Sequence, residues 1–225
     1  MHVVFDLDGT LVDSVGVCTS ILNGMLAERG SDRRLSTSEV GGFVSIGGTA
    51  MVSGLLGDDC GDPEMEIRAF RELYSSLPTP PGSLYAGAAE ALAALREAGA
   101  SLTICSNKPQ PLCEKVLTDL DLARHFDAIV GSAPGLPRKP DPAILHHTLK
   151  DAAAGLDRCC LVGDAGPDYQ LARRAGIPFI LMTHGYGSDE CASREVVRCD
   201  RFSDLPPLAL AALGREAPAE SHASR

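Results

Sequence analysis

The stretch Val3–Leu11 constrains this chain more than any other part of it, because it reads Val-Val-Phe-Asp-Leu-Asp-Gly-Thr-Leu. The apolar run at its start favours a buried strand, and Gly9 breaks that strand. Side chains alternate along a strand, so Asp6 and Asp8 point the same way if the chain stays extended. Two carboxylates that lose water together need a cation or a proton to compensate. With a buried strand before them and a Gly-Thr turn after them, these acids indicate a functional site rather than a solvated loop.

Length and composition set the class of protein. The 225 residues suffice for one large domain or for a core with an insert, and a hydrophobic fraction of 44% can supply a real core. Lys and Arg number 20 against 30 Asp and Glu, which gives a net charge of -10. That balance argues against a general affinity for nucleic acid or for an anionic membrane, although not against a local anion site. No apolar run approaches the length of a membrane span.

The start of the chain and its cysteines favour a cytoplasmic protein. Met1 and His2 lead straight into the first strand, with no basic region or separate apolar segment, so no signal peptide is expected. The eight cysteines show no zinc-ligand spacing. Buried free thiols in a reducing cytosol are favoured over disulfides.

The segment after the first motif predicts helices without strands. Between about residues 14 and 77 apolar positions recur at helical spacing, and Ser36 with Glu39 has the pattern of a capping box. Residues 78–82, Pro-Thr-Pro-Pro-Gly, form a stiff linker at its end. Helices are expected over residues 13–30, after Ser36, over 50–56 and over 63–77.

Beyond that linker the sequence alternates between strands and helices, which predicts an α/β fold with a parallel sheet and helices on both faces. Such sheets bind ligands outside the carboxyl ends of their strands. The tail from Gly214 is expected to be disordered. Strands are expected at 101–105, 128–130, 159–162 and 177–181, and helices at 86–98, 109–120, 142–150, 167–175 and 205–213.

Two polar stretches follow predicted strands in this half of the chain. In Ser-Asn-Lys-Pro at 106–109, Ser106 offers a hydroxyl, and the start of the next helix offers free N–H groups to an anion. A simple N-cap is the alternative for this stretch. Further on, Pro140 holds Lys139 in an extended segment, and a solvated surface charge is the alternative for that lysine.

A third stretch supplies acids. Asp164 lies just past a buried strand, where a carboxylate needs a partner. Asp168 is four residues further, in the first turn of a predicted helix whose start it would also stabilise. Together the strand ends carry acids, a hydroxyl and a lysine, which is the set that phosphoryl transfer requires. Hard oxygen ligands of this kind suit Mg²⁺ best.

With these motifs the chain resembles the haloacid dehalogenase superfamily, and within it phosphatases of the phosphoglycolate phosphatase type. The resemblance extends over most of residues 1–212, and it is far more specific for the superfamily than for the substrate. The motifs that carry it are Asp-Leu-Asp-Gly-Thr at 6–10, Ser-Asn-Lys at 106–108, Lys-Pro at 139–140 and Gly-Asp at 163–164 with Asp168.

The resemblance implies a Rossmann-like parallel-sheet core with an inserted α-helical cap. The core would comprise residues 1–13 and 82–213, the cap residues 14–81, and residues 214–225 would be a tail. The strand-free segment described above agrees with this division. The partner would be a small phosphorylated metabolite, and the protein would be a monomer or a homodimer.

By the same resemblance, Asp6 is the nucleophile that forms an aspartyl-phosphate. Asp8 is the acid that protonates the leaving oxygen and then activates water. Lys139 holds the phosphate and the nucleophile together. The residues assigned to substrate binding in the core are Thr10, Ser106 and Asn107.

The resemblance also implies a Mg²⁺ site. Its ligands would be Asp6, the backbone carbonyl of Asp8, Asp164 and, directly or through an intervening contact, Asp168. One departure from the pattern is Ala-Gly-Pro at 165–167, where relatives often carry a Ser and an Asn. The departure weakens the hydrogen bonding expected around the metal ligands.

Two features of the cap bear on substrate choice. Gly47 and Gly48 are assigned to a cap loop that reaches the crevice, with a plain interhelical turn as the alternative. Arg68 and Arg71 are candidates for reading a substrate carboxylate, with solvated helix charges as the alternative.

These observations predict a Mg²⁺-dependent phosphatase that hydrolyses a small phosphate monoester, phosphoglycolate-like or a sugar phosphate. A sugar-phosphate mutase of the same family stays open as an alternative. A dehalogenase would leave Asp8 and the Mg²⁺ site without a use. A non-catalytic module that accepts phosphate as a signal would not need the complete acid–base and lysine set.

Overall fold

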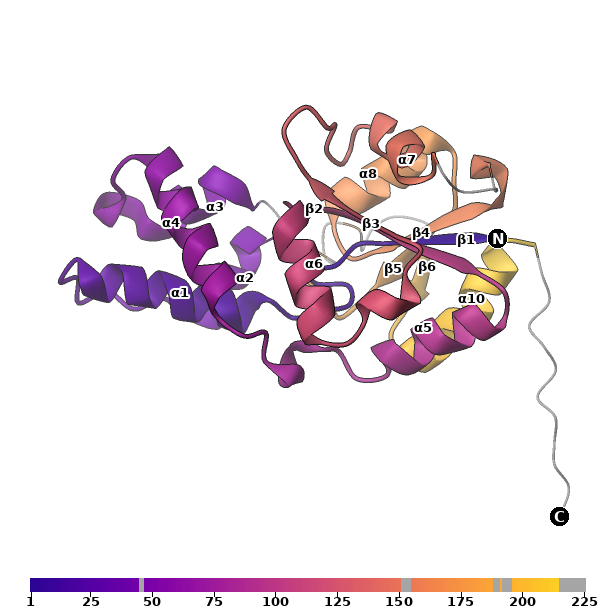
Figure 1. The fold of residues 1–225 in the computed structure, drawn as a ribbon, viewed down its shortest axis with the longest axis horizontal. Helices are drawn as coiled ribbons and strands as arrows, with labels where there is room; N and C mark the ends of the chain where they lie inside the picture. Colours follow the sequence, from indigo (N-terminus) through magenta and orange to yellow (C-terminus); the bar gives the residue numbers. More distant parts are fainter. Residues whose placement is uncertain (45–46, 151–154, 188–190, 192–195, 215–225) are drawn as a thin grey trace, which may run out of the picture.

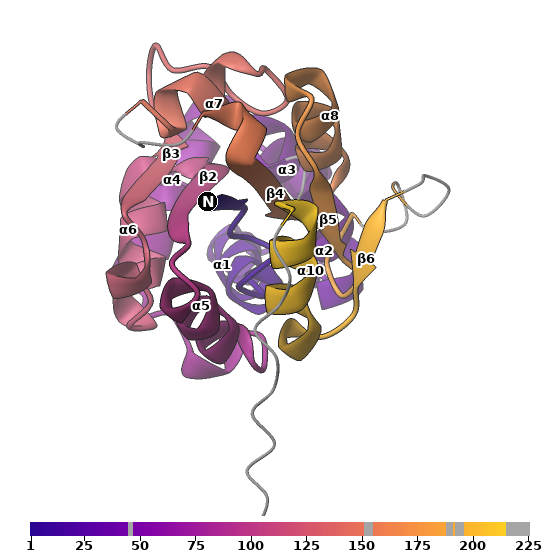
Figure 2. The same ribbon diagram turned by 90° about the vertical axis from the view of Figure 1, so that its right-hand side faces the viewer.

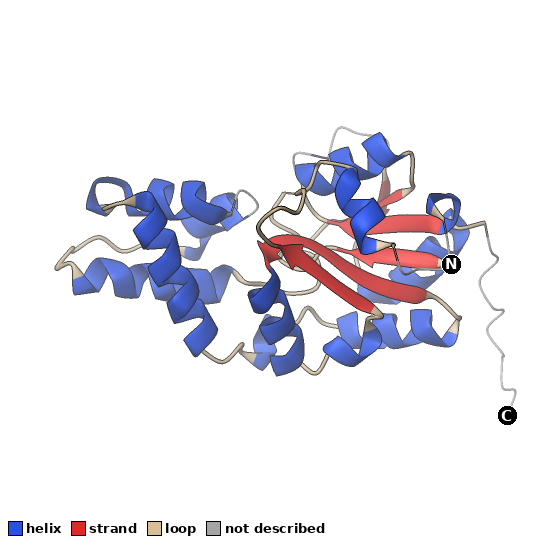
Figure 3. Ribbon diagram, turned by 45° about the horizontal axis from the view of Figure 1, so that its top comes forward, coloured by secondary structure: helices blue, strands red, loops and turns tan. Residues whose placement is uncertain are grey.

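The computed structural model describes residues 1–44, 47–150, 155–187, 191 and 196–214. Its centre is a six-stranded, fully parallel sheet, which confirms the predicted α/β class. Figure 3 shows the strands as one sheet. The strand order is β3-β2-β1-β4-β5-β6, so β1 lies inside the sheet between strands from far along the chain. The strands are β1 (His2–Phe5), β2 (Ser101–Pro109), β3 (Ala128–Ser132), β4 (Cys159–Gly163), β5 (Phe179–Met182) and β6 (Val197–Cys199).

The alternation of side chains along β1 builds two apolar layers. Val3 and Phe5 belong to the core that packs under α5, α6 and α10, whereas Val4 belongs to the core under α7 and α8. Figure 2 shows these two groups of helices on opposite sides of the sheet. Both faces of β1 are therefore dry, as is usual for parallel sheets. The helices are α5 (Ala88–Glu97), α6 (Gln110–Asp119), α7 (Ala143–Thr148), α8 (Gly166–Ala175) and α10 (Leu205–Ala212).

A lobe of helices occupies one end of the elongated molecule (Figure 1). The described residues of 14–77 contain no strand, as predicted. Ser36 and Glu39 exchange the hydrogen bonds of the predicted capping box at the start of α2. Asp62 caps α4 by accepting from two backbone N–H groups, and Pro63 opens that helix. The helices of the lobe are α1 (Val15–Glu28), α2 (Thr37–Val44), α3 (Gly48–Leu56) and α4 (Pro63–Ser76).

The chain passes between the sheet and the lobe twice, and the two passages are paired. Val12 forms an antiparallel bridge with Leu84. The N–H of Tyr85 donates to the carbonyl of Leu11 at 3.1 Å. Both passages therefore leave the sheet side by side, close to the carboxyl end of β1.

The structure corrects two predicted boundaries near the site. β2 continues to Pro109 rather than ending at residue 105, with a register shift against β3 beyond Cys105. In consequence α6 begins at Gln110, so Pro109 precedes this helix instead of opening it. The short strand β6 has no counterpart among the predicted strands.

Three further expectations concern the cysteines, membrane-spanning helices and the C-terminal tail. Free thiols are found at Cys18, Cys60, Cys105, Cys113, Cys159, Cys160 and Cys199. Across the described part of the chain, no helix combines the length and the apolar character that crossing a bilayer requires. The tail predicted to be disordered lies, beyond Gly214, outside the described residues.

Candidate active site

The carboxyl ends of the central strands bring polar side chains to a cavity of about 340 Å³. The cavity lies between this edge of the sheet and helices α3 and α4 of the lobe. Asp6, Ser106, Lys139 and Asp164 line it, each from a different strand end or following loop. This is the crevice that the parallel sheet predicts for a ligand.

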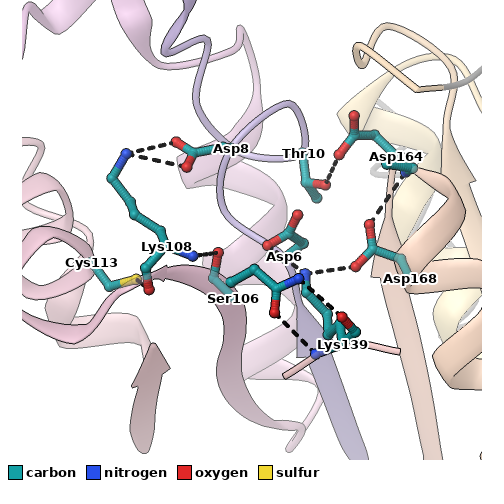
Figure 4. Close-up of polar contacts among 11 residues, drawn as sticks. Asp6, Asp8, Thr10, Ser106, Lys108, Cys113, Lys139, Asp164 and Asp168 are labelled. Atoms are coloured by element: carbon teal, nitrogen blue, oxygen red, sulfur yellow. Dashed lines mark hydrogen bonds and ion pairs between the residues drawn. The ribbon is translucent and has the colours of Figure 1, made fainter. Parts of the chain in front are cut away.

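Asp6 and Lys139 form a buried ion pair at the centre of the site (Figure 4). Nζ of Lys139 lies 2.7 Å from Oδ1 of Asp6, and it donates to Oδ1 of Asp168 at 2.7 Å. Burial lowers the pKa of Lys139, but Asp168 and Asp6 raise it by more, so its ammonium stays charged. Burial raises the pKa of Asp6 to about 6, against the opposing effect of Lys139. The candidate nucleophile thus lies beside a fixed positive charge.

Asp164 is held by three hydrogen-bond donors. The Thr10 hydroxyl donates to Oδ1 at 3.0 Å, and the backbone N–H groups of Tyr186 and Gly187 donate to Oδ2 at 2.9 and 3.4 Å. Burial, with Asp168 and Asp6 adding to it, raises the pKa of Asp164 to about 8. Thr10 is itself fully buried, so the structure places this expected substrate-binding residue on a neighbouring carboxylate instead of on the cavity wall.

Two glycines allow the backbone to approach Asp164. Gly9 has a φ of +81°, which disfavours a side chain, and a Cβ there would collide with the Asp164 carboxylate. A Cβ at Gly185 would collide with Asp164 as well. The turn after β1 and the loop after β5 are therefore both shaped around this carboxylate.

The acids present fit a divalent cation. Asp6, Asp164 and Asp168 each place a carboxylate oxygen within 4.8 Å of the other two. Lys139 is the ammonium that contacts this group, so ionisation of all three acids leaves an excess of negative charge. Hard oxygen donors with surplus negative charge suit Mg²⁺. Asp168 also accepts from the backbone N–H of Ala165 at 3.2 Å, so it orients Lys139 and the start of α8 besides adding charge.

Asp8 points away from this acidic group, towards a second lysine (Figure 4). Nζ of Lys108 lies 3.1 Å from both Oδ1 and Oδ2 of Asp8, and the Ser14 hydroxyl donates to Oδ1. Burial lowers the pKa of Lys108, but Asp8 and other neighbours raise it by more. Asp6 and Asp8 both line the cavity, but β1 ends at Phe5 and a different lysine holds each carboxylate, so the two side chains do not point the same way as an extended chain would require.

Lys108 is part of the Ser-Asn-Lys motif, but the sequence analysis assigns it no role. Its signal is its place in the Ser-Asn-Lys motif, which follows the apolar part of β2 at the carboxyl edge of the sheet. Residues 106–109 all line the cavity. Lys108 also places its ammonium 4.2 Å from the ring centroid of Tyr74, a contact that no sequence pattern indicates.

Asn107 supports Lys139 directly. Its side-chain amide donates to the Lys139 carbonyl at 3.1 Å, and its side-chain oxygen accepts the Lys139 N–H at 3.0 Å. The Ser106 hydroxyl accepts the N–H of Lys108 at 3.3 Å. Asn107 thus fixes the backbone of the segment that presents the central lysine.

The lobe contributes the opposite wall of the cavity. Gly47 and Gly48 line it at the start of α3, with φ values of +62° and +60°. Arg71 lines it from α4, whereas Arg68, three residues earlier, does not. Arg138 lines it from the loop that leads to Lys139.

Comparison with known proteins shows the family to which this chain belongs. A family model described as haloacid dehalogenase-like hydrolase matches residues 3–182. A phosphoglycolate phosphatase of Rhodospirillum rubrum is 35% identical over 200 residues, which cover 85% of this chain and 83% of that protein. A phosphoglycolate phosphatase of Cereibacter sphaeroides is 38% identical over 192 residues, which cover 82% of this chain and 85% of that protein.

Solved structures share the fold. One described as a predicted phosphoglycolate phosphatase from Haemophilus somnus has a TM-score of 0.77 at 23% identity and covers 90% of this chain and 94% of its own. CbbY from Rhodobacter sphaeroides, in complex with phosphate, has a TM-score of 0.76 at 22% identity and covers 95% of this chain and 98% of its own. At such identities the likeness supports the fold alone.

Proposed function

This chain belongs to the haloacid dehalogenase-like hydrolase family and is a phosphoric monoester hydrolase, and we propose that Mg²⁺ and an aspartyl-phosphate intermediate carry its reaction. We propose as its substrate a small phosphate monoester, phosphoglycolate-like or a sugar phosphate. The observation that carries this proposal is the buried contact between Asp6 and Lys139 beside two further carboxylates.

In the first step a carboxylate oxygen of Asp6 attacks phosphorus, the bond from phosphorus to the leaving oxygen breaks, and Asp6 becomes an acyl phosphate. Lys139 supplies positive charge to the phosphoryl oxygens, because its ammonium already lies 2.7 Å from Asp6. Ser106, which lines the cavity from β2, offers its hydroxyl to the same group. Asn107 keeps Lys139 in place through its two backbone contacts.

Asp8 provides the proton for the leaving oxygen and removes one from water in the second step. Its contacts with Lys108 and Ser14 hold its carboxylate at the cavity. Asp8, Lys108 and Ser14 all lie at the junction between the sheet and the helical lobe.

The acidic group is the proposed Mg²⁺ site. Asp6, Asp164 and the backbone carbonyl of Asp8 would hold the ion, with Asp168 oriented by Lys139. Bound Mg²⁺ supplies positive charge that offsets the surplus of the acids and favours attack on phosphorus. Thr10, Tyr186 and Gly187 hold Asp164 ready for this role through their hydrogen bonds.

The helical lobe is the proposed cap, comprising residues 14–81, on a core of residues 1–13 and 82–213. Its two passages to the core lie side by side, which suits a hinge. Closure of the cap over the cavity would exclude water and set specificity, with Gly47 and Gly48 on the cap wall as substrate-binding positions.

Turnover and trapping test the proposal together. Purified protein with Mg²⁺ would be assayed against phosphoglycolate, sugar phosphates, nucleotides, pyrophosphate and p-nitrophenyl phosphate, and radiolabelled intermediate would be trapped by rapid acid quench. Asp6→Asn is expected to abolish turnover and the trapped adduct. Asp62→Asn is the matched control, because Asn also caps α4 at this exposed position. An adduct that persists in Asp6→Asn, or full turnover in excess chelator, contradicts the mechanism.

A further inference from the structure

The loop after β5, residues 183–187, lies against both passages of the chain between the core and the proposed cap. The ring of His184 packs on the ring of Tyr85, in the second passage, with the ring centroids 4.0 Å apart. Nε2 of His184 lies 3.2 Å from the carbonyl oxygen of Thr10, at the start of the first passage. Within this loop, the mechanism proposed above uses only the two N–H groups that donate to Asp164.

Tyr186 connects two parts of the site through two different groups. Its backbone N–H donates to Oδ2 of Asp164 at 2.9 Å. Its phenol oxygen accepts the backbone N–H of Ser14 at 2.6 Å, and its hydroxyl donates to Oδ1 of Asp13 at 2.8 Å. Asp13 and Ser14 directly precede α1, so the tyrosine hydroxyl fixes the point at which the chain enters the proposed cap.

Ser14 extends this connection to Asp8. Ser14 is buried, and its hydroxyl donates to Oδ1 of Asp8. The position of that hydroxyl depends on the position of the Ser14 backbone, which the phenol of Tyr186 holds. The contacts thus run from the acidic group through Tyr186 and Ser14 to Asp8.

Ser14 occupies the N-cap position of α1 but does not cap the helix. A serine hydroxyl at this position normally accepts an N–H of the first turn. In the described first turn of α1 Ser14 makes no such bond, and its hydroxyl donates to Asp8 instead. The carboxylate of Asp13, which Tyr186 contacts, accepts the N–H of Val15 at 3.0 Å in its place. The Ser14 side chain therefore positions Asp8 rather than stabilising the start of the helix.

We propose that Tyr186 is a positioning residue whose hydroxyl, acting through Ser14, sets the position of Asp8 relative to Asp164. This inference rests on the proposed phosphatase function. In that function Asp8 exchanges protons with the leaving oxygen and with water, and Asp164 holds the Mg²⁺ that acts on the same phosphoryl group. A displacement of Asp8 relative to Asp164 therefore slows the proton transfers, even though each carboxylate is still present.

The test uses Tyr186→Phe, which removes the hydroxyl and keeps the N–H that donates to Asp164. The protein with saturating Mg²⁺ would be assayed in single-turnover experiments with p-nitrophenyl phosphate and with an alkyl phosphate from the substrate screen above. Tyr169→Phe is the matched control, because the Tyr169 ring packs on Phe179 in the apolar core under α7 and α8. Ser14→Ala, alone and combined with Tyr186→Phe, completes a double-mutant cycle.

Tyr186→Phe should slow formation of the phosphoryl-enzyme by about three- to thirtyfold for the alkyl phosphate, which is a part of what general acid–base catalysis supplies. The loss should be smaller for p-nitrophenyl phosphate, because its leaving group needs less protonation. Ser14→Ala should show the same difference between the two esters, and the double variant should lose no more than Ser14→Ala. The rise in melting temperature with Mg²⁺ should equal that of wild-type protein, and Tyr169→Phe should change neither readout.

Four results would overturn the inference while the phosphatase function stands. They are an unchanged rate in Tyr186→Phe, an equal loss for both esters, a weaker response of that variant to Mg²⁺, and losses that add in the double variant. The last three are what a merely structural role in the loop would give. Absence of turnover of every ester by wild-type protein with Mg²⁺ would remove the proposed function itself and the inference with it.

Discussion

Lys108 holds its ammonium nitrogen 3.1 Å from each carboxylate oxygen of Asp8, and the same nitrogen lies 4.2 Å from the centroid of the Tyr74 ring. Asp8 comes from the turn after the central strand, whereas Tyr74 comes from α4 of the helical lobe. One buried cation thus connects the proposed acid–base residue with the proposed cap. The packing of α4 against the core and the position of Asp8 therefore both involve the Lys108 side chain.

Lys108→Met tests this connection. The substitution keeps an apolar stem and removes the ammonium that holds the Asp8 carboxylate in position, so the activation of water by Asp8 should slow. We expect kcat to fall by roughly tenfold or more, up to the 10²–10⁴ that general acid–base catalysis supplies. Rapid-quench trapping at steady state should then show more phosphoryl-enzyme than in wild-type protein.

The control for that prediction is Lys115→Met on α6. Lys115 forms an ion pair with Asp119 on the same helix, away from the cavity. Such a partly exposed pair contributes about 0–1 kcal/mol, so activity should not change. Normal kcat and no accumulation of intermediate in Lys108→Met would show that Lys108 does not control Asp8.

Asp164→Asn separates metal binding from folding. The buried carboxylate is costly in the metal-free protein, because burial and the neighbouring acids raise its pKa to about 8. An amide can still accept the N–H of Tyr186 through its oxygen and donate to the Thr10 hydroxyl. We therefore expect the variant, in excess chelator, to melt at the same temperature as wild-type protein or higher.

The same variant should lose most of its response to Mg²⁺. A ligand that binds the folded state raises the melting temperature, and removal of one carboxylate weakens that binding. Differential scanning fluorimetry across a Mg²⁺ titration measures both effects. A metal-free variant that melts well below wild-type protein, yet gains as much from Mg²⁺, would contradict the assigned role of Asp164.

Gly48→Ala tests the cap wall. Gly48 has a φ of +60°, where a side chain costs about 1–2 kcal/mol, and it lines the cavity. The ratio of kcat/KM for a sugar phosphate to that for p-nitrophenyl phosphate should fall, with Mg²⁺ affinity unchanged. Gly24→Ala, on the exposed side of α1, is the control and should be neutral or slightly stabilising. A uniform loss over all substrates with weaker Mg²⁺ binding would argue against a role in specificity.

Much of the core of the site could be predicted because it depends on local patterns and one topological rule. Asp6, Ser106 and Asp164 each follow an apolar run, and parallel strands bring their carboxyl ends to one edge, where the loop that carries Lys139 also lies. The strand-free segment of residues 14–77 could be predicted as well, because helical periodicity and helix caps such as that of α4 depend on residues that are close together in the sequence.

The other features of the site could not be predicted, because they depend on contacts between segments that are far apart in the sequence. The pairing of Lys108 with Asp8 spans a hundred positions of sequence, and it needs β2 to extend three residues beyond its apolar part. Arg68 and Arg71 look alike in the sequence, and only the packing of α4 decides which one faces the cavity. The resemblance assigns Thr10 to substrate binding, whereas its hydroxyl donates to Asp164, a contact between residues 154 positions apart that no local pattern indicates.

Asp6 and Asp8 have different proposed roles, nucleophile and acid–base residue, and Asp8→Asn removes only the role of Asp8. The variant keeps the nucleophile and, through the Asp8 backbone carbonyl, the proposed contact with Mg²⁺. It loses both the acid for the leaving oxygen and the base for water, which together contribute about 10²–10⁴ in rate. A good leaving group needs less protonation, so formation of the intermediate should suffer less for p-nitrophenyl phosphate than for an alkyl phosphate. Dephosphorylation should be slow with either substrate, so the acyl phosphate should accumulate from p-nitrophenyl phosphate. Rapid-quench trapping and turnover rates for both esters measure this, and normal turnover of the alkyl phosphate by Asp8→Asn would refute the role given to Asp8.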